Sequence, residues 1–353
     1  MVNMRDVARL AGVSAPTVSY VINNGPRPVS EETRARVQRA IKELGYKPNT
    51  LARGLARKAT LSIAFIVPDI SDLFFARLAH AVEEVAYSSG FSLFLCNTER
   101  DLRREISYFS LLAEKRVDGV LLISCGISSE QLRRCISEDL PLVVLDREIK
   151  GATADTVLFD TFAAGKQATE HMIKHGYNRI ACLAGPKPLI GAVQRVEGYR
   201  AALEEHGIAP DNELIRWSDY TFKDGLRVAG EMLRESRKFQ AIVACNDEMG
   251  VSAIHAARRL GMRVPEDMAV IGIGDSFIGQ TVIPQLTTIS GSVDEMGHLG
   301  TELLLDRVRG VASWTQKHIV LETTPVIRES CGCGRSAGVE RPAAKKFRAR
   351  IDQ

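Results

Sequence analysis

The stretch GVSAPTVSYVINNG, residues 12–25, predicts a short helix with one apolar side and one uncharged polar side. Ser14 can cap this helix, and Pro16 falls in its first turn, where the missing backbone N–H costs nothing. Val18 and Val21 share one face, which predicts packing on that side only. The polar side is therefore free to meet a partner.

A second short helix precedes this stretch. Asn3 can cap it, with Asp6 as the reciprocal member of a capping box, and Gly12 can end it as a left-handed residue. Two short helices joined by a glycine-containing turn are typical of a helix-turn-helix, which places its second helix in the major groove of DNA. A third helix from Ser30 through EETRARVQRAIKELGY completes a predicted domain over residues 2–46.

Charge is unevenly distributed along the chain, although the formal net charge is only +3. Residues 1–60 hold 11 Lys and Arg against 4 Asp and Glu, whereas residues 61–327 have an excess of acidic residues. A basic head on an acidic body indicates a polyanion-binding module joined to a different kind of domain. A plain helical hairpin is the alternative for the head, but it would not require this charge. Residues 331–353 are basic without periodicity and predict a disordered tail.

Length and composition favour a multidomain globular protein. A chain of 353 residues predicts two or three domains, and 45% hydrophobic residues are enough for real cores. No apolar run approaches the roughly 18 residues of a membrane span. The charged, helical N-terminal sequence is unlike a secretory signal, so we expect a cytoplasmic protein with no membrane partner and no cofactor.

The seven cysteines do not form the even framework that disulfides would require. Five of them lie in or beside apolar runs and are predicted to be buried free thiols of a reducing compartment. These five are Cys96, Cys125, Cys135, Cys182 and Cys245. Cys331 and Cys333 suggest a metal site, but two thiols one residue apart with no histidine nearby in the sequence are a poor ligand set. We therefore expect no metal site.

Residues 61–330 alternate buried strand patterns with helical ones. The strand patterns are LSIAFIV, FSLFLC, VDGVLLI, PLVVL, RIACLA, QAIVA and MAVIGI. Near-continuous apolar strands joined by crossover helices predict parallel sheets, and two doubly wound α/β lobes fit the length. The first lobe is expected at about 61–161 and 292–327, and the second at about 162–291.

Polar and aromatic residues follow the predicted strands, where ligands bind to open α/β sheets. They are Asp69, Ser71, Asp72, Phe74, Phe75, Asn97, Thr98, Ser124, Asp146, Arg147, Asn246, Asp247 and Asp275. Taken singly, an Asp after a strand is more often a helix cap than a ligand. Together, carboxylates, amides and a guanidinium among aromatic rings suit a polyhydroxylated ligand.

The head strongly resembles the DNA-binding domain of the LacI/GalR family of bacterial transcription regulators. The resemblance is carried by MRDVARLAGVSAPTVSYVINN, residues 4–24, and by VSEETRARVQRAIKELGYKPNTLARGLA, residues 29–56. It implies DNA contacts by Ser14, Ala15, Pro16, Thr17, Ser19, Tyr20 and Asn23. A proline at a base-reading position departs from the family, so we expect an apolar contact there, such as a thymine methyl, with Tyr20 as the main polar reader.

Residues 47–60 contain a weak helix pattern. Apolar residues including Leu55 recur, but Gly54 weakens the helix, and so short a helix is marginal by itself. The resemblance implies a hinge helix that pairs with its dimer mate in the minor groove, with Leu55 wedged between base steps beside Ala52 and Arg53. An ordinary linker is the alternative that the residues alone would favour.

Residues 61–330 resemble the regulatory core of the same family, which is similar to type I periplasmic sugar-binding proteins. The implied ligand positions are Phe74, Asp146, Phe162, Arg195, Tyr220, Asn246 and Asp275. The family's strand-end acid is here Gly274, which leaves only Asp275 of an acidic pair. A different sugar, a sugar phosphate and a non-sugar therefore stay open as effectors.

An enzyme is one alternative to a transcription regulator. The sequence GIGDSFIG, residues 272–279, lacks the spacing of a dinucleotide-binding loop, and no Asp/His pattern supports a hydrolase triad. An architectural DNA-binding protein without an effector is the other alternative. The sequence favours a non-enzymatic, homodimeric repressor, with a tetramer left open. It is expected to bind a pseudo-palindromic operator and to respond to a small, carbohydrate-like effector.

Overall fold

The computed structural model describes residues 2–23, 28–46, 59–137, 139–235, 239–311 and 315–333. The chain divides into a head unit within residues 1–62, with which residues 116–118 group, and a core unit made of the rest. Three predicted DNA-contact residues, Ala52, Arg53 and Leu55, lie outside the described residues, as does the side chain of Asn23.

The head is a bundle of three helices, α1 (Met4–Ala11), α2 (Ala15–Asn23) and α3 (Glu31–Leu44). The predicted capping box is present, because the Asn3 side chain accepts from Asp6 N and Asp6 Oδ2 accepts from Asn3 N at 3.0 Å. Gly12 ends α1 with a φ of 64°, so the chain turns directly into α2. The core of the bundle consists of Val7, Ala8, Ala11, Val18, Val21, Val37, Ala40 and Tyr46. The sequence prediction of a helix-turn-helix is confirmed.

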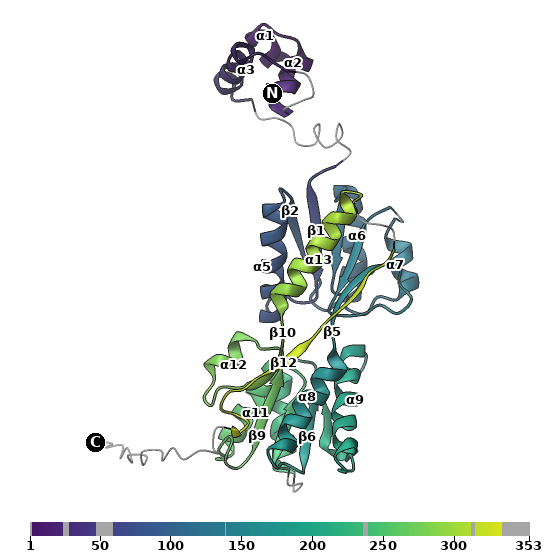
Figure 1. The fold of residues 1–353 in the computed structure, drawn as a ribbon, viewed down its shortest axis with the longest axis vertical. Coiled ribbons are helices and arrows are strands. Elements are labelled where there is room, and N and C mark those ends of the chain that lie inside the picture. The colour runs from purple at the N-terminus through teal and green to yellow at the C-terminus, as the bar shows by residue number, and fades with distance from the viewer. Residues whose placement is uncertain are drawn as a thin grey trace, which may run out of the picture. The chain divides into compact units, whose positions relative to one another are not determined.

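The first lobe of the core is built on a sheet with the order β11-β5-β4-β3-β1-β2. Its strands are β1 (Ser62–Val67), β2 (Ser92–Asn97), β3 (Gly119–Leu122), β4 (Leu142–Leu145), β5 (Asp155–Phe159) and β11 (His318–Leu321). Its helices are α5 (Leu73–Ser88), α6 (Leu102–Lys115), α7 (Ser129–Cys135) and α13 (Val293–Val308). The central strands are buried on both faces, because helices cover the sheet (Figure 1).

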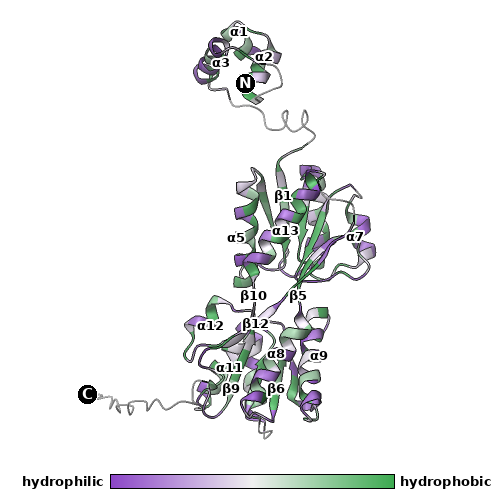
Figure 2. Cartoon of the chain, viewed as in Figure 1, coloured by the Kyte–Doolittle hydropathy of each residue, from purple (hydrophilic) through white to green (hydrophobic). Residues whose placement is uncertain are grey.

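The second lobe repeats this plan with the sheet order β12-β10-β9-β8-β6-β7. Its strands are β6 (Ile180–Ala184), β7 (Ile215–Trp217), β8 (Ala241–Ala244), β9 (Ala269–Ile273), β10 (Thr287–Gly291) and β12 (Thr323–Val326). Its helices are α8 (Thr161–Lys174), α9 (Ile190–Glu205), α10 (Phe222–Arg234), α11 (Asp247–Arg259) and α12 (Phe277–Thr281), with a short 3₁₀ turn at Asn212–Leu214. In Figure 2 the core strands are mostly hydrophobic, whereas the flanking helices carry hydrophilic residues.

Two details of the predicted lobes are wrong. Residues 323–326 were assigned to the first lobe, but β12 pairs antiparallel with β10 in the second. The chain therefore crosses between the lobes three times, after β5, after β10 and after β11. The pattern FSLFLC was predicted as a buried strand, but β2 is an edge strand that leaves Phe94 and Leu95 exposed.

The predicted disordered tail begins too early. Cys331 is fully buried, and Ser330 Oγ donates to Val270 O at 2.7 Å, so this segment completes the core of the second lobe. His171 Nε2 lies 2.9 Å from Cys333 Sγ, so the histidine that the local sequence lacks is supplied by α8. Burial lowers the pKa of His171 to about 4, and His175 and Lys174 add to this, so its imidazole is neutral. Cys125 and Cys135 were predicted to be buried but are partly exposed.

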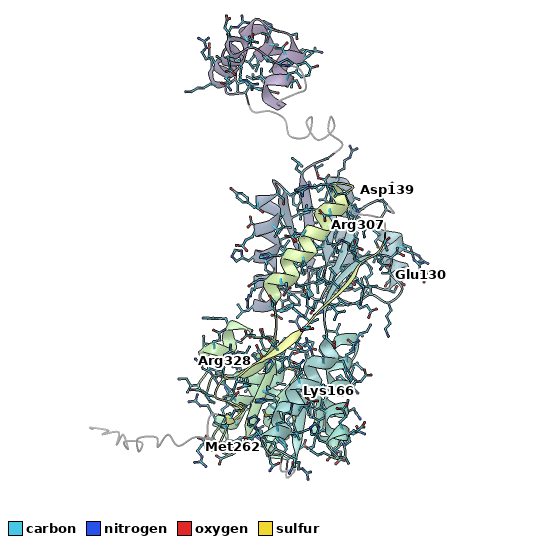
Figure 3. The ribbon with its side chains drawn as sticks, in the orientation of Figure 1. Glu130, Asp139, Lys166, Met262, Arg307 and Arg328 are labelled. Atoms are coloured by element: carbon cyan, nitrogen blue, oxygen red, sulfur yellow. The ribbon has the colours of Figure 1, made fainter. Side chains whose placement is uncertain are left out.

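A buried ion pair ties α13 to the sheet of the first lobe. Arg307 Nε donates to Asp155 Oδ2 at 2.7 Å, and its Nη2 donates to Asp155 Oδ1 at 2.8 Å. The side chains are only 10% and 4% exposed, and Figure 3 marks Arg307 on its helix.

Within the described part of the chain, no helix combines the length and apolarity needed to cross a bilayer.

Candidate DNA-binding and ligand-binding sites

Helix α2 presents the face that was predicted to read DNA. Val18 is fully buried against the other two helices, whereas Ser14 and Pro16 are exposed. The remaining described candidates, Ala15, Thr17, Ser19 and Tyr20, are half-buried. The opposite side of α2 thus supplies the bundle core and leaves this face accessible.

Ser14 plays the predicted capping role. Its Oγ accepts from Thr17 N at 3.3 Å and lies 2.8 Å from Thr17 Oγ1. The two hydroxyls therefore share a hydrogen bond at the N-terminus of α2, where backbone N–H groups also favour an anion. Exposed cations elsewhere on the head are Arg5, Arg9, Arg36, Arg39 and Lys42.

All seven predicted effector residues line one cavity of about 1000 Å³ in the core. Phe74 of α5 and Asp146, after β4, come from the first lobe. The second lobe supplies Phe162, Arg195, Tyr220, Asn246 and Asp275. The cavity lies where the carboxyl ends of strands from both lobes meet, which is the usual position of ligands in open parallel sheets.

Arg195 is the cation that the second lobe places in the cavity. Its Nη1 donates to Cys245 O at 2.6 Å and to Tyr220 Oη at 3.3 Å. Its Nε is buried and has no hydrogen-bond partner among the described residues. Burial raises the pKa of Tyr220 to about 12, so its phenol remains neutral beside the guanidinium. Arg195 thus has a donor that a ligand oxygen could accept from.

Asp146 supplies an acceptor from the first lobe. Arg147 Nε lies 3.7 Å from Asp146 Oδ2, and Arg147 Nη1 donates to Ser124 O at 3.0 Å. The Arg147 guanidinium also lies 5.6 Å from the centre of the Phe75 ring. Arg147 and Phe75 follow predicted strands but were not among the predicted effector residues, and both line the cavity.

Asn246 and Asp275 also have structural roles. Asn246 caps α11, accepting from Met249 N at 2.9 Å, and its Nδ2 donates to Tyr220 O at 2.9 Å. Asp275 forms an ion pair with Arg328, marked in Figure 3, whose side chain is 12% exposed. Both side chains therefore have protein partners as well as lining the cavity.

Gly274 explains the departure from the family's acidic pair. Its φ is 136°, a backbone conformation that residues with a side chain rarely adopt. The backbone here thus differs from one that an Asp would favour. A side chain added at Gly274 would lie 3.7 Å from Asp247 Oδ2, and the buried Asp247 side chain accepts from Thr288 Oγ1 at 2.6 Å.

Unusual backbone geometry is concentrated at the cavity. Asp146, Tyr220 and Asp275 have φ values of 59°, 72° and 52°, and Arg100, which also lines the cavity, has 60°. Non-glycine residues in this left-handed region cost free energy and cluster at ligand sites. The fold therefore contains this unfavourable backbone conformation at residues that line the cavity.

Arg100 was not predicted to belong to the site, although it lines the cavity, and several residues predicted to lie at the site do not line it. Arg100 Nη1 donates to Asp219 O at 2.9 Å and so joins the two lobes beside the cavity. Its position just after β2 was the available signal. Asp69, Ser71, Asn97 and Thr98 do not line the cavity; Asn97, for example, accepts from Ile70 N at 3.1 Å.

Comparison with known proteins identifies both units. The family described as bacterial regulatory proteins, lacI family, matches residues 3–49. The family described as periplasmic binding proteins and sugar binding domain of LacI family matches residues 60–313.

Similar whole proteins agree with this. The transcriptional regulator DegA of Bacillus subtilis (strain 168) is 36% identical over 92% of this chain and 96% of its own. The ribose operon repressor of Escherichia coli (strain K12) is 36% identical over 93% of this chain and 99% of its own. A Lac repressor dimer bound to operator and the anti-inducer ONPF superimposes with a TM-score of 0.84, at 27% identity over 94% of this chain and 99% of the other. The chain belongs to the lacI family of bacterial regulatory proteins and is a DNA-binding transcriptional regulator.

Proposed function

We propose that this chain is a homodimeric repressor whose affinity for a pseudo-palindromic operator changes when a neutral sugar occupies the core cavity. One observation carries the proposal. Seven side chains from two lobes line a single cavity of about 1000 Å³. Three crossovers connect these lobes, and the same chain carries a helix-turn-helix.

A polyhydroxylated ligand matches the chemistry of the cavity. Sugar hydroxyls both donate and accept, and the cavity offers Asp146 as an acceptor and Arg195 as a donor. Phe74 and Phe162 add aromatic surface, and Phe162 is 40% exposed. Aromatic rings cover the apolar faces of sugar rings in such sites.

A neutral ligand is favoured over a sugar phosphate because anionic groups also line the cavity. Among the described residues, the cavity is lined by seven acidic side chains and five cationic ones, so a phosphate would add to an excess of negative charge. Burial raises the pKa of Glu248, and the nearby Asp72 adds to this, so further negative charge there is costly. The cation Arg77 is already occupied by Asp294, with Nη2 to Oδ2 at 2.7 Å.

DNA binding is assigned to the exposed face of α2 and to the hinge. Ala15, Pro16 and Tyr20 read bases, Ser14, Thr17 and Ser19 lie near phosphates, and Asn23 completes the contact face. Leu55 enters the minor groove, flanked by Ala52 and Arg53. Binding of this kind takes place in the cytoplasm, on the chromosome.

Homodimerisation is supported by the exposed apolar residues of the core. Tyr87 of α5 is 77% exposed, and Phe94 and Leu95 of the edge strand β2 are 43% and 40% exposed. In the second lobe, Phe277 and Ile283 are 67% and 75% exposed. Clusters of exposed large apolar residues mark protein interfaces.

The experiment has two parts that share one purified protein. Isothermal titration with free pentoses and hexoses, sugar phosphates and purines identifies the ligand class. Fluorescence anisotropy with an operator selected from random DNA then measures affinity with and without the ligand found. We expect a neutral sugar to bind and to change operator affinity about five- to 150-fold. Operator binding that no small molecule alters would instead identify an architectural DNA-binding protein.

A further inference from the structure

A cluster of sulfur and imidazole ligands lies in the second lobe, and the proposed function does not use it. Cys333 Sγ lies 2.9 Å from His171 Nε2 and 2.8 Å from Cys331 Sγ. The ligand atoms of His171, His175 and Cys333 all lie within 4.8 Å of one another. Two segments more than 150 residues apart in the sequence therefore bring these three side chains together, and Cys331 adjoins them through Cys333.

The two histidines are placed by helix geometry. His171 lies in the last turn of α8 and His175 is its C-cap residue, so their side chains, four residues apart, share one face. Their ring centres are 4.5 Å apart. His175 Nδ1 bonds to His171 O at 2.7 Å, which orients the ring and leaves Nε2 available.

The two cysteines are placed by a turn that is anchored on both sides. Gly332 has a φ of 80°, and a side chain on it would meet Tyr177 Oη at 3.1 Å, so this position requires glycine. Tyr177 Oη donates to Cys331 O at 3.1 Å. Thr287 Oγ1 donates to Cys331 Sγ at 3.1 Å. The turn thus places Cys333 Sγ against the end of α8, with Cys331 Sγ next to it.

We propose that His171, His175, Cys331 and Cys333 form a structural zinc site that fastens the end of the core to helix α8. Zinc in structural sites is tetrahedral, with Zn–S near 2.3 Å and Zn–N of about 2.0–2.1 Å. Ligand atoms of such a site are separated by about 3.3–3.8 Å, given these bond lengths. The two closest pairs here need to open by less than about 1 Å, and Cys331 Sγ needs to move closer to the histidines, because only His171, His175 and Cys333 all lie within 4.8 Å of one another. The chain already supplies a hydrogen bond behind His175.

Zinc is the metal that this donor set favours. Two thiolates with two imidazoles in a tetrahedral arrangement select zinc over magnesium or calcium, which require oxygen ligands. All four positions are filled by protein, so the site is of the structural and not the catalytic kind. Its effect is to hold residues 328–333, which follow β12, against α8, the first helix after the first crossover.

A disulfide between Cys331 and Cys333 is the competing chemistry. It would remove both thiolate ligands, so it and zinc exclude each other. The count of titratable thiols separates them: a metal-free, denatured chain has seven free thiols without the disulfide and two fewer with it.

The test uses the full-length protein, purified without metal or chelator. Zinc is measured by inductively coupled plasma mass spectrometry after dialysis against equimolar zinc, and cobalt replacement reports thiolate coordination by its charge-transfer bands. Cys333→Ser and His175→Ala remove ligands. Cys135→Ser controls for the loss of a thiol, and His206→Ala is matched to His175, because His206 Nδ1 makes the same bond to the carbonyl four residues back, Ala202 O, at 2.8 Å.

We expect one zinc per chain in the wild type and in both controls, and at least tenfold weaker binding in the two ligand variants. A chelator should lower the melting temperature of the wild type and the controls but not of Cys333→Ser. Protein that binds no zinc while all seven thiols titrate would overturn the proposal. So would two missing thiols, or zinc binding that both ligand variants retain. None of these outcomes depends on DNA or on the effector.

Discussion

Arg195 shows how a single residue connects packing with ligand recognition. Its Nη1 is used by Cys245 O and Tyr220 Oη, which fix the guanidinium, while its buried Nε has no protein partner among the described residues. A buried donor without a partner costs free energy that a ligand oxygen would recover. In the proposed effector site, Arg195 is therefore the expected donor to the ligand.

Arg195→Ala is expected to weaken effector binding by about tenfold or more, because losing a charged hydrogen bond costs roughly 1.5–3 kcal/mol. Asp146→Ala is expected to have an effect of the same size. Operator binding without effector should stay at the wild-type level in both. Isothermal titration and anisotropy measure the two affinities. Arg227→Ala, an exposed arginine on α10, is the control; wild-type effector affinity in both cavity variants would show that the cavity is not the effector site.

Pro16 is expected to read one base pair through an apolar contact. Pro16→Ala should leave the melting temperature of the head nearly unchanged, since the residue is exposed in the first turn of α2. It should reduce discrimination at one base pair per half-site, where a mismatched base pair typically costs about 1–3 kcal/mol. Selection of operators from random DNA with both proteins measures this. An identical base preference at every position would exclude Pro16 as a reader.

At the scale of elements, ion pairs of similar geometry differ in how much they contribute to the stability of the fold. The Arg307–Asp155 pair joins α13 to β5 and is almost fully buried, and Lys317 N also donates to Asp155 Oδ1 at 2.7 Å. The Arg263–Asp267 pair has the same two-pronged geometry, but its side chains are 69% and 37% exposed. Burial is what separates the two pairs.

Arg307→Ala is expected to lower the free energy of unfolding by about 3–5 kcal/mol, because it leaves the Asp155 carboxylate buried without its partner. Arg263→Ala should leave the melting temperature nearly unchanged, since water screens an exposed pair. Urea denaturation of the core measures both variants. Equal effects would mean that burial does not control the contribution of these pairs.

The hinge, residues 47–60, is predicted from the sequence to be a helix that is only marginally stable by itself. Leu55→Ala is expected to retain the fold, the dimer and the effector affinity while losing the DNA bend. Operator affinity should fall toward the nonspecific level, commonly about a thousandfold or more below specific binding. Electrophoretic bending assays and effector titration check both halves of this prediction. A retained bend and retained operator affinity would reduce the segment to a passive tether.

In the whole molecule, regulation requires that the core transmit ligand binding to the head. Three crossovers connect the two lobes of the core, and Arg100 Nη1 to Asp219 O is a contact between the lobes that a relative rotation of the lobes would change. A coupling of about 1–3 kcal/mol is enough for a switch in operator affinity.

Deleting residues 1–60 is expected to abolish DNA binding and to leave effector affinity unchanged, because the cavity belongs entirely to the core. The intact protein should lose roughly a thousandfold in operator affinity between about 50 and 200 mM salt, if a dimer makes about six phosphate contacts. Anisotropy at several salt concentrations and calorimetry of the truncated core test this. A truncated core that still binds the operator would contradict the division of roles.

Local patterns were sufficient for much of this protein. Capping residues, the Gly12 turn and the spacing of apolar residues determined the three helices of the head, because such signals act over a few residues. Continuous apolar runs determined most core strands, and strand ends predicted where a cavity would form. The resemblance to a family then supplied the seven effector positions, which local patterns could not choose among.

Long-range pairing was decided only by the tertiary structure. The short, polar TTPV segment gives no signal for its antiparallel partner β10, and a run such as FSLFLC does not reveal that it lies at an edge. His171 and Cys333 are adjacent only because β12 returns the chain to the second lobe. Arg100 and Arg328 likewise meet Asp219 O and Asp275, which lie far from them in the sequence. Neighbouring residues set propensity and capping, whereas contacts between distant segments depend on how the lobes pack, which no local pattern encodes.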